Sequence, residues 1–403
     1  MADERAYTKG WDDAEMGVFG VRTIGVVTVA RSDYGIYLPL LRRIREDPDL
    51  RLLLIVAGMH LSPEFGLTVR AIEEDGFEIG ERVEMLLSSD TPEAISKSMG
   101  LGTIGFAQAF ARFRPDILLV LGDRFEMHSA AVAAVPFGIP IGHIHGGEST
   151  EGVIDDVFRH SITKMSHMHF VANEAYARRV IQMGEEPWRV VISGAPGLDN
   201  LHLVRLLSRE KLEEKFMMRL RKPILLVTYH PVTLEHEQTE IQVQSLLSAL
   251  EQVNAMLIFT YPNADTHSRT IIRMINQFVA EHEEARVVTN LGTQAYLSFI
   301  KYATAMVGNS SSGIIEAASF KLPVVNIGSR QRGRIRGKNV IDVGYSQPDI
   351  VVGIKKALSH EFRASLSDMN NPYGDGHAAE RIIERLKHVE LDNKLLLKRF
   401  YEP

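Results

Sequence analysis

The chain has 403 residues, of which 45% are hydrophobic and 24% charged, as in an ordinary globular protein with room for two or three domains. The formal net charge of −6 argues against general nucleic-acid binding, although it leaves room for a local basic pocket. There is no cysteine, which excludes disulfides, thiolate metal sites and cysteine nucleophiles and fits a reducing compartment.

The first twenty residues are polar and mixed in charge, without the apolar centre of a signal peptide. No stretch of the sequence is long and apolar enough to span a membrane. We therefore expect a cytoplasmic protein with a weakly structured extension at 1–20, in which Trp11 and Phe19 are the side chains able to dock on the body.

Short apolar runs alternate with amphipathic segments along the rest of the chain. Continuous apolar runs predict strands buried on both faces, and the helical patterns between them, such as 93–112 and 240–253, predict βαβ units. About eleven strands are too many for one comfortable open sheet, so we expect two α/β lobes with parallel sheets. The predicted strands are 23–29, 52–56, 117–121, 140–144, 169–171, 190–192, 224–228, 256–260, 286–288, 305–307 and 324–327.

The boundary between the lobes is predicted near 199–222, because a Gly-Ala-Pro-Gly loop at 194–197 precedes it and a charged helical stretch at 209–221 follows. This gives an N-terminal lobe at 21–200 and a C-terminal lobe at 201–375, both Rossmann-like, with a central cleft. Ligands of open α/β sheets bind at the carboxyl ends of the strands, so these ends are where functional residues are expected.

Two motifs in the first lobe do not support the chemistry that they resemble. Gly100, Gly102 and Gly105 match the dinucleotide fingerprint but lie inside a predicted helix that Thr91 and Pro92 begin, so we expect them to pack this helix closely on the sheet.

The second is a possible metal site. His143 and His145 share a face of a predicted strand and could both reach one metal ion. The other blocks of dinuclear metallophosphoesterases are missing and the spacing is too short, so no metal site is predicted.

Polar residues follow the first two strands. Arg31 is predicted to bind an anion where the backbone N–H groups of a helix start, near Ile36, also point outward. Asp33 is either a second ligand contact or, like Ser32, a helix cap. His60, at the turn after the second strand, is either a ligand contact or a surface histidine.

Carboxylates and histidines follow the next two strands. Asp123 ends the aliphatic run at 117–121, so we expect it to be half buried, aimed into the cleft and raised in pKa as an acid or base; the alternative is a helix cap. Arg124 comes next, and His145 and Glu148 follow the neighbouring strand.

A helix is predicted to open with Asp155 and Asp156 at its positive end. Arg159 and His160 follow at positions i+3 and i+4 from Asp156, on neighbouring faces. A capped and charge-paired helix explains most of these residues, but it does not explain why acids and histidines gather at successive strand ends.

Strand ends in the second lobe carry a different set of residues. His230 ends the first strand, Asn263 follows the second, and Ser310, Ser311 and Ser312 follow a later one at a helix start. Free N–H groups, hydroxyls and the helix dipole combine there into a predicted phosphate cradle.

Glu316, one turn further on, is placed to accept hydrogen bonds from two ribose hydroxyls. Arg330 and Arg334 lie in a basic loop suited to a diphosphate. The alternative is a serine cap beside a solvated basic loop.

Taken together, these residues resemble the hydrolysing UDP-N-acetylglucosamine 2-epimerases of sialic-acid synthesis, over about residues 22–388. The resemblance implies a GT-B-like fold in which the C-terminal lobe holds UDP and helices at about 376–400 return to the first lobe. It implies that Ser311, Ser312 and Glu316 hold diphosphate and ribose, that Arg330 binds the pyrophosphate and that Arg31 closes on the phosphates. The blocks that carry it lie at 123–126, 143–148, 154–164, 194–199, 230–233 and 308–313.

The activity that the resemblance implies is elimination of UDP to a glycal, followed by hydration to N-acetylmannosamine. Asp123 and Asp155 match the acid/base positions of the family, and His230 matches a catalytic histidine near the diphosphate. No metal or redox cofactor is required, and the family often forms dimers or tetramers. This route needs positive charge beside the leaving diphosphate and an acid/base pair on two faces of the sugar, and both requirements make physical sense.

One departure from the family is His145, which stands where animal enzymes and non-hydrolysing epimerases have a catalytic glutamate. Either His145 takes that role or Glu148 contributes instead, as the His-Ile-His-Gly-Gly-Glu form of bacterial members allows. Some bacterial relatives act on UDP-2,4-diacetamido-2,4,6-trideoxyglucose, which the sequence does not separate from UDP-GlcNAc. Three competing functions are a non-hydrolysing epimerase, a GT-B glycosyltransferase and a nucleotide-sugar sensor.

Overall fold

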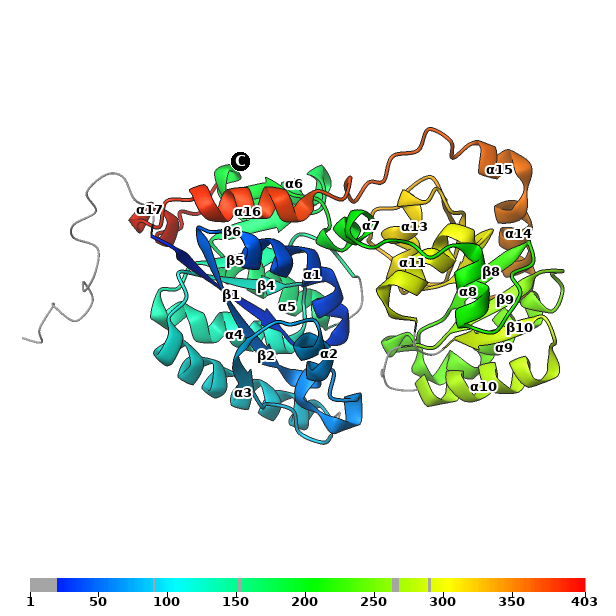
Figure 1. The fold of residues 1–403 in the computed structure, drawn as a ribbon, viewed down its shortest axis with the longest axis horizontal. Helices are drawn as coiled ribbons and strands as arrows, with labels where there is room; N and C mark the ends of the chain where they lie inside the picture. The colour runs from blue at the N-terminus through cyan, green and yellow to red at the C-terminus, as the bar shows by residue number, and fades with distance from the viewer. Residues whose placement is uncertain (1–19, 90, 151–153, 263–267, 289–290, 403) are drawn as a thin grey trace, which may run out of the picture.

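The structure, a computed structural model, describes residues 20–402 except 90, 151–153, 263–267 and 289–290. It consists of two α/β lobes, each built on an entirely parallel sheet (Figure 1). The predicted extension, with Trp11 and Phe19, lies outside the described residues apart from Gly20. Within the described ranges, no helix is both long enough and apolar enough to cross a membrane.

The first lobe has seven strands in the order β3-β2-β1-β4-β5-β6-β7. Its central strands are completely buried because helices cover both faces of the sheet. The strands are β1 (Arg22–Thr28), β2 (Leu50–Ala57), β3 (Ile79–Val83), β4 (Ile117–Leu121), β5 (Ile141–Ile144), β6 (Met168–Val171) and β7 (Val190–Ile192). The helices are α1 (Arg31–Glu46), α2 (Val69–Glu74), α3 (Pro92–Phe113), α4 (Phe125–Ala134), α5 (Asp155–Met165) and α6 (Glu174–Gln182).

The second lobe has six strands in the order β10-β9-β8-β11-β12-β13. They are β8 (Ile224–Thr228), β9 (Met256–Thr260), β10 (Ala285–Val288), β11 (Ala305–Gly308), β12 (Val324–Ile327) and β13 (Val340–Val343). The helices from the seam onward are α7 (Asn200–Leu203), α8 (Arg209–Lys215), α9 (Thr239–Leu250), α10 (Ser268–Glu281), α11 (Gly292–Tyr302), α12 (Ser311–Ile314), α13 (Glu316–Ser319), α14 (Gln347–Leu358) and α15 (His360–Ala364).

All eleven predicted strands are present, with ends shifted by two residues at most, but β3 and β13 were not predicted. Both are edge strands that pair with one neighbour and keep part of their surface exposed. Their sequences therefore lack the continuous apolar run that marks a strand buried on both faces.

The glycines of α3 bring this helix against its neighbours at two of the three predicted positions. A Cβ on Gly102 would lie 2.5 Å from Cε of Met85, and one on Gly105 would lie 2.6 Å from Cγ1 of Val83 in β3. A Cβ on Gly100 would meet nothing within 4 Å, so the expectation of close packing was wrong there. Thr91 caps the helix, as predicted, by accepting a hydrogen bond from the N–H of Ala94.

The C-terminal segment crosses back to the first lobe, where α16 (Ala378–His388) lies beside α1 (Figure 1). Ile382 and Leu386 of α16 belong to the same hydrophobic core as strands β1 to β6. The carboxylate of Asp199 accepts hydrogen bonds from the N–H groups of Ala378 and Ala379, which the helix itself leaves without partners. A residue at the seam thereby fixes the start of the returning helix.

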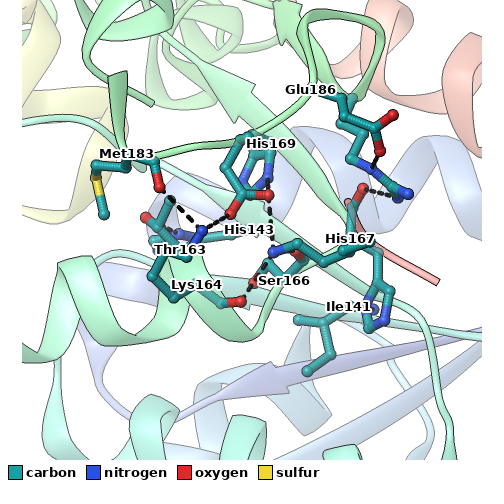
Figure 2. A network of polar contacts seen from close by, with 12 residues as sticks. Ile141, His143, Thr163, Lys164, Ser166, His167, His169, Met183 and Glu186 are labelled. Atoms are coloured by element: carbon teal, nitrogen blue, oxygen red, sulfur yellow. Dashed lines mark hydrogen bonds and ion pairs between the residues drawn. The ribbon is translucent and has the colours of Figure 1, made fainter. Parts of the chain in front are cut away.

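A buried ion network holds the final residues, which include α17 (Asn393–Leu396), on the first lobe (Figure 2). Glu185 has no exposed surface and accepts from Lys164 Nζ at 2.6 Å, from Lys398 Nζ at 2.7 Å and from His169 Nε2 at 3.0 Å. Burial alone would raise the pKa of Glu185, but these three partners lower it to about 2. The carboxylate therefore stays charged, and Lys398 ties the end of the chain to it.

Candidate active site

Asp123 lies at the carboxyl end of β4, after a turn in which Gly122 has φ +74°. Its side chain is about one quarter exposed, at 26%, and Oδ2 accepts a hydrogen bond from Nη2 of Arg159. Asp123 does not cap α4, because the N-cap residue is Arg124. The half-buried position follows the prediction, whereas the positive partner was not anticipated.

Arg159 is the buried centre of this part of the site. Its side chain is 2% exposed, and it donates to Asp156 at 2.5 Å and to Thr150 at 3.1 Å as well as to Asp123. Burial, together with the nearby charge of Arg334, lowers the pKa of Arg159 to about 9. The guanidinium of Arg159 thus pairs with two carboxylates, which suits a positioning role, and a substrate contact of Arg159 stays a prediction.

His145 and Glu148 form a pair in the loop after β5. His145 has φ +65°, and its Nδ1 lies 2.6 Å from Oε1 of Glu148, which is 3% exposed. Burial works to raise the pKa of Glu148, but His145 and Arg334 lower it overall. The carboxylate is therefore charged and accepts a hydrogen bond from Nδ1–H. The other ring nitrogen, Nε2, takes no part in this hydrogen bond.

His143 is directed elsewhere, beneath the Asp123 turn. It is fully buried, with Nε2 2.7 Å from the carbonyl of Gly122 and Nδ1 3.1 Å from Oγ1 of Thr163. Burial lowers its pKa to about 3. His143 and His145, which could have met at one metal ion, thus have separate sets of partners, and His143 supports the turn that presents Asp123.

Asp155 is the first residue of α5 and is partly exposed; residues 151–153 just before it lie outside the described ranges. Its charge contributes to raising the pKa of Arg124, after the larger contributions of Glu126 and Asp33. Arg124 also pairs, at 3.2 Å, with the fully buried Glu126. Burial alone would lower the pKa of Arg124, but the neighbouring carboxylates raise it overall.

The residues after β1 and β2 differ from the predictions in two respects. Helix α1 begins at Arg31 and not near Ile36, so Arg31 lies exposed on its first turn. Asp33 is buried, and Oδ2 accepts from the N–H of Ala30, the N-cap residue, which is the capping alternative. Burial raises the pKa of Asp33 to about 6.

His60 is the second difference. It has no exposed surface, and its ring nitrogens lie 3.0 Å from Oγ1 of Thr28 and 2.7 Å from Oγ1 of Thr68. The surface alternative is therefore wrong, because the ring is enclosed with two protein partners, and the ligand contact stays a prediction. Burial lowers the pKa of His60 to about 4, so the ring supports the loop as a neutral group.

In the second lobe, Asn309 joins two strand ends. Its Oδ1 accepts from the N–H of His230 at 2.7 Å, and its Nδ2 donates to the carbonyl of His230 at 2.8 Å. Arg330 and Gln331 donate to the carbonyl of Asn309 at 3.1 and 2.9 Å. Sequence reasoning missed Asn309 and Gln331; the only indication was the place of Asn309 directly after an apolar strand, where an amide can donate and accept at once.

Burial, with the charge of Arg330, lowers the pKa of His230 to about 3, so this ring is neutral at physiological pH. Ser310 is the N-cap of α12 and accepts from the N–H of Ser312 at 3.3 Å, as the capping alternative expects, and Ser311 opens the helix. Asn263 lies outside the described residues.

Glu316, at the start of α13, has a pKa raised by burial in spite of nearby Ser312 and Arg334. Among the described residues, neither Oε2 of Glu316 nor Oγ of Ser312 has a well-formed hydrogen bond, although both atoms are buried. Groups of this kind need a partner, and a bound polar ligand is one way to supply it.

The two lobes meet where these residues lie. A Cβ on Gly197 would be 3.7 Å from Cγ1 of Ile36 in α1 and 3.9 Å from Oε1 of Glu316. Tyr176 of the first lobe accepts from the N–H of Ile335 at 3.1 Å, and Tyr373 donates to the carbonyl of Ile335 at 3.0 Å. The basic loop that carries Arg330 and Arg334 is thereby attached to the first lobe.

Four histidines with lowered pKa make a prediction for acid stability; His60, His143 and His230 are buried, and His167 is partly buried. Burial is the largest cause that lowers the pKa of His60 and His167 to about 4 and of His143 and His230 to about 3. The unfolded chain, with histidine pKa near 6.5, binds more protons below that value than the folded chain does. The free energy of unfolding should therefore fall from pH 6.5 toward pH 4, by up to about 1.4 kcal/mol per pH unit for each histidine. Urea unfolding at pH 7, 6 and 5 measures this, and a free energy that stays level or rises toward pH 5 would contradict it.

Two Rossmann-like lobes, with carboxylates, histidines and a serine loop at their strand ends, define a class of two-lobed α/β proteins. Residues 42–387 match the family described as UDP-N-acetylglucosamine 2-epimerase. A GDP/UDP-N,N'-diacetylbacillosamine 2-epimerase (hydrolyzing) from Campylobacter jejuni is 41% identical over 94% of this chain and 99% of its own length. A UDP-N,N'-diacetylbacillosamine 2-epimerase (hydrolyzing) from Legionella pneumophila is 38% identical over 94% of this chain and 99% of its own length.

Among solved structures, the UDP-GlcNAc 2-epimerase of Neisseria meningitidis bound to UDP-GlcNAc has a TM-score of 0.78 over 90% of this chain and 99% of its own. At 16% identity it shows the shared GT-B-like fold alone. The family match and the relatives together establish that this chain belongs to the hydrolysing UDP-sugar 2-epimerases of the UDP-N-acetylglucosamine 2-epimerase family.

Proposed function

We propose that this chain converts UDP-2,4-diacetamido-2,4,6-trideoxyglucose, which is UDP-N,N'-diacetylbacillosamine, into UDP and the free 2-epimeric sugar. The observation that carries the proposal is the high identity, 41% and 38% over nearly their full lengths, to two relatives named for this substrate. It replaces UDP-GlcNAc, the first choice from the sequence, as the preferred sugar.

The proposed chemistry is elimination followed by hydration. Asp123 takes the C2 proton while the C1–O bond breaks and UDP leaves with the bonding electrons, which produces a glycal. His145 then delivers a proton to C2 from the opposite face, and water adds its oxygen to C1. The proton released by that water returns to His145, and Asp123 gives its proton to the departing UDP or to solvent, so both groups regain their starting protonation states and the net reaction consumes one water.

Three features support this division of roles. Asp123 is partly exposed at a strand end, and Arg159 holds its carboxylate in place. Glu148 fixes His145 through Nδ1, which leaves Nε2 to exchange a proton with a substrate. Asp155 is partly exposed at the start of α5, where it is suited to orient the sugar or the water.

UDP is proposed to lie against the second lobe. Glu316 and Ser312 have buried oxygens that lack well-formed hydrogen bonds among the described residues, which suits ribose and phosphate partners. Arg330 and Arg334 supply positive charge for the diphosphate, and neutral His230 donates an N–H to it without adding charge. Arg31, exposed on the first turn of α1, closes on the phosphates from the other lobe.

UDP-GlcNAc remains the second candidate substrate, because a UDP-N-acetylglucosamine 2-epimerase of Neisseria meningitidis is 32% identical over 95% of this chain. The two sugars differ at C4, where an acetamido group replaces a hydroxyl, and at C6, where a methyl group replaces a hydroxymethyl group. A site built to hydrogen-bond one of these groups strongly rejects the analogue that lacks it.

The test measures kcat/KM for release of UDP from each sugar nucleotide with the purified enzyme. We expect UDP-2,4-diacetamido-2,4,6-trideoxyglucose to be preferred by a factor of about 100 or more. Equal values, or a preference for UDP-GlcNAc, would overturn the assignment of the substrate and leave the family unchanged.

A further inference from the structure

A charged contact crosses from the second lobe to the His145–Glu148 pair. Nη2 of Arg334 lies 3.7 Å from Oε2 of Glu148, while Oε1 of the same carboxylate is 2.6 Å from Nδ1 of His145. The carboxylate of Glu148 therefore contacts both the imidazole of His145 and the guanidinium of Arg334, and the three groups form a series of contacts across the lobe interface. Glu148 is buried at 3% exposure, so water screens these interactions little.

The guanidinium of Arg334 has weak contacts in this series. Its ion pair with Glu148 is long, and among the described residues its buried Nε has no hydrogen-bond partner. The rest of its loop is firmly attached, through the two tyrosine contacts of Ile335. The side chain is thus anchored by its backbone but keeps donors to spare, which suits a guanidinium that must exchange one anionic partner for another.

We propose that Arg334 couples occupancy of the diphosphate site to the protonation of His145, by transferring its charge from Glu148 to the bound diphosphate. This inference rests on the proposed UDP site and adds a function to it. When Arg334 turns to the diphosphate, Glu148 loses a positive neighbour and holds an imidazolium at His145 more strongly. His145 is then protonated while UDP is present, as its role as the proton donor to C2 requires, and releases the proton more readily after UDP leaves.

The other groups around His145 act in the same direction or stay constant. His143 lies behind it on β5 and is neutral, since burial lowers its pKa to about 3. Glu316 approaches from the second lobe, and the charge of His145 counts among the influences that lower its pKa against the larger effect of burial. Binding a diphosphate adds negative charge near all of them, which also favours the imidazolium. The contribution that belongs to Arg334 is therefore defined by the difference between the wild type and a variant without that charge.

The experiment follows the imidazole resonances of ¹⁵N-histidine-labelled full-length enzyme by NMR over a pH series, with and without saturating UDP. The His145 resonance is the one that disappears in His145→Gln. In the wild type, UDP should raise the titration midpoint of this ring by about one pH unit. In Arg334→Gln the midpoint without UDP should already be raised, and UDP should move it by less than half as much.

Arg332→Gln is the matched control, because Arg332 carries the same charge on the same loop but has an exposed side chain. It should reproduce the wild-type shift. An unchanged midpoint in the wild type with UDP bound, or the same shift in Arg334→Gln, would overturn the coupling alone. Calorimetry on the same samples reports UDP binding itself, and absence of binding would contradict both the coupling and the proposed function. Because no sugar is used, a wrong assignment of the sugar leaves this test unaffected.

Discussion

Replacing Asp123 by asparagine should reduce kcat by about 10³-fold, while the Kd for UDP stays within about threefold of the wild type. The amide oxygen can still accept a hydrogen bond from Arg159, so the local geometry is preserved. What the variant loses is the ability to take a proton, which is needed only in the transition state, so kcat falls and UDP binding does not. Single-turnover kinetics and calorimetric titration with UDP measure the two quantities.

The matched control for Asp123→Asn is Asp156→Asn. Asp156 is the second carboxylate on the same guanidinium, at 2.5 Å, but we assign it no proton transfer. If Asp123 is the base, Asp156→Asn should cost much less activity, about tenfold or below, through weaker positioning alone. Comparable losses in both variants would mean that the Arg159 network, and not a proton-accepting Asp123, is what matters. Normal turnover by Asp123→Asn would make the acid/base assignment wrong.

Replacing Gly308 by alanine should destabilise the protein by about 3 kcal/mol or more, or prevent its folding. Gly308 ends β11 with φ +134°, and an added Cβ would lie 1.9 Å from the carbonyl oxygen of Thr228 in β8. The clash is with the backbone of a central strand, so no side chain can move aside to relieve it. Because Asn309 and the serine loop follow directly, any folded fraction should also bind UDP more weakly.

Gly100→Ala provides the comparison for Gly308→Ala. The same atom is added, but at Gly100 it meets nothing within 4 Å and lies in the middle of α3. Alanine is favoured over glycine in a helix, so stability should stay equal or rise by up to about 1 kcal/mol. Urea unfolding of both variants tests the pair, and a Gly308→Ala midpoint equal to that of the wild type would show that the strand end tolerates a side chain.

Most of the fold was predictable because the central strands of a parallel sheet are buried on both faces. That condition favours continuous apolar runs, which β4 has from end to end and β8 has up to its last residue, Thr228. The same reasoning fails at sheet edges, where β3 and β13 are half exposed and carry mixed sequences. The start of α1 was placed five residues too late, because a run of polar residues can open a helix as well as precede one.

The candidate site was predictable in its residue types and places, but not in its pairings. The strand ends identified Asp123, His145 and His230, since parallel strands bring their carboxyl ends to one edge. Local sequence could not show that His60 is enclosed between two threonines. Nor could it show that Arg159 donates a hydrogen bond to Asp123, which lies 36 residues earlier in the chain. The contact between Glu148 and Arg334 depends on how the two lobes meet, which no local pattern encodes.

The central claim is that this chain releases UDP by elimination to a glycal and then hydrates the glycal at C1. The most direct test is proton NMR of the purified enzyme with UDP-2,4-diacetamido-2,4,6-trideoxyglucose, and in parallel with UDP-GlcNAc, in deuterated water. The account predicts free UDP and a 2-epimeric sugar that carries deuterium at C2, because the new C2 proton comes from a solvent-exchanged group. Release of UDP with the original proton still at C2 would contradict it, and would indicate direct hydrolysis or transfer of the sugar to water.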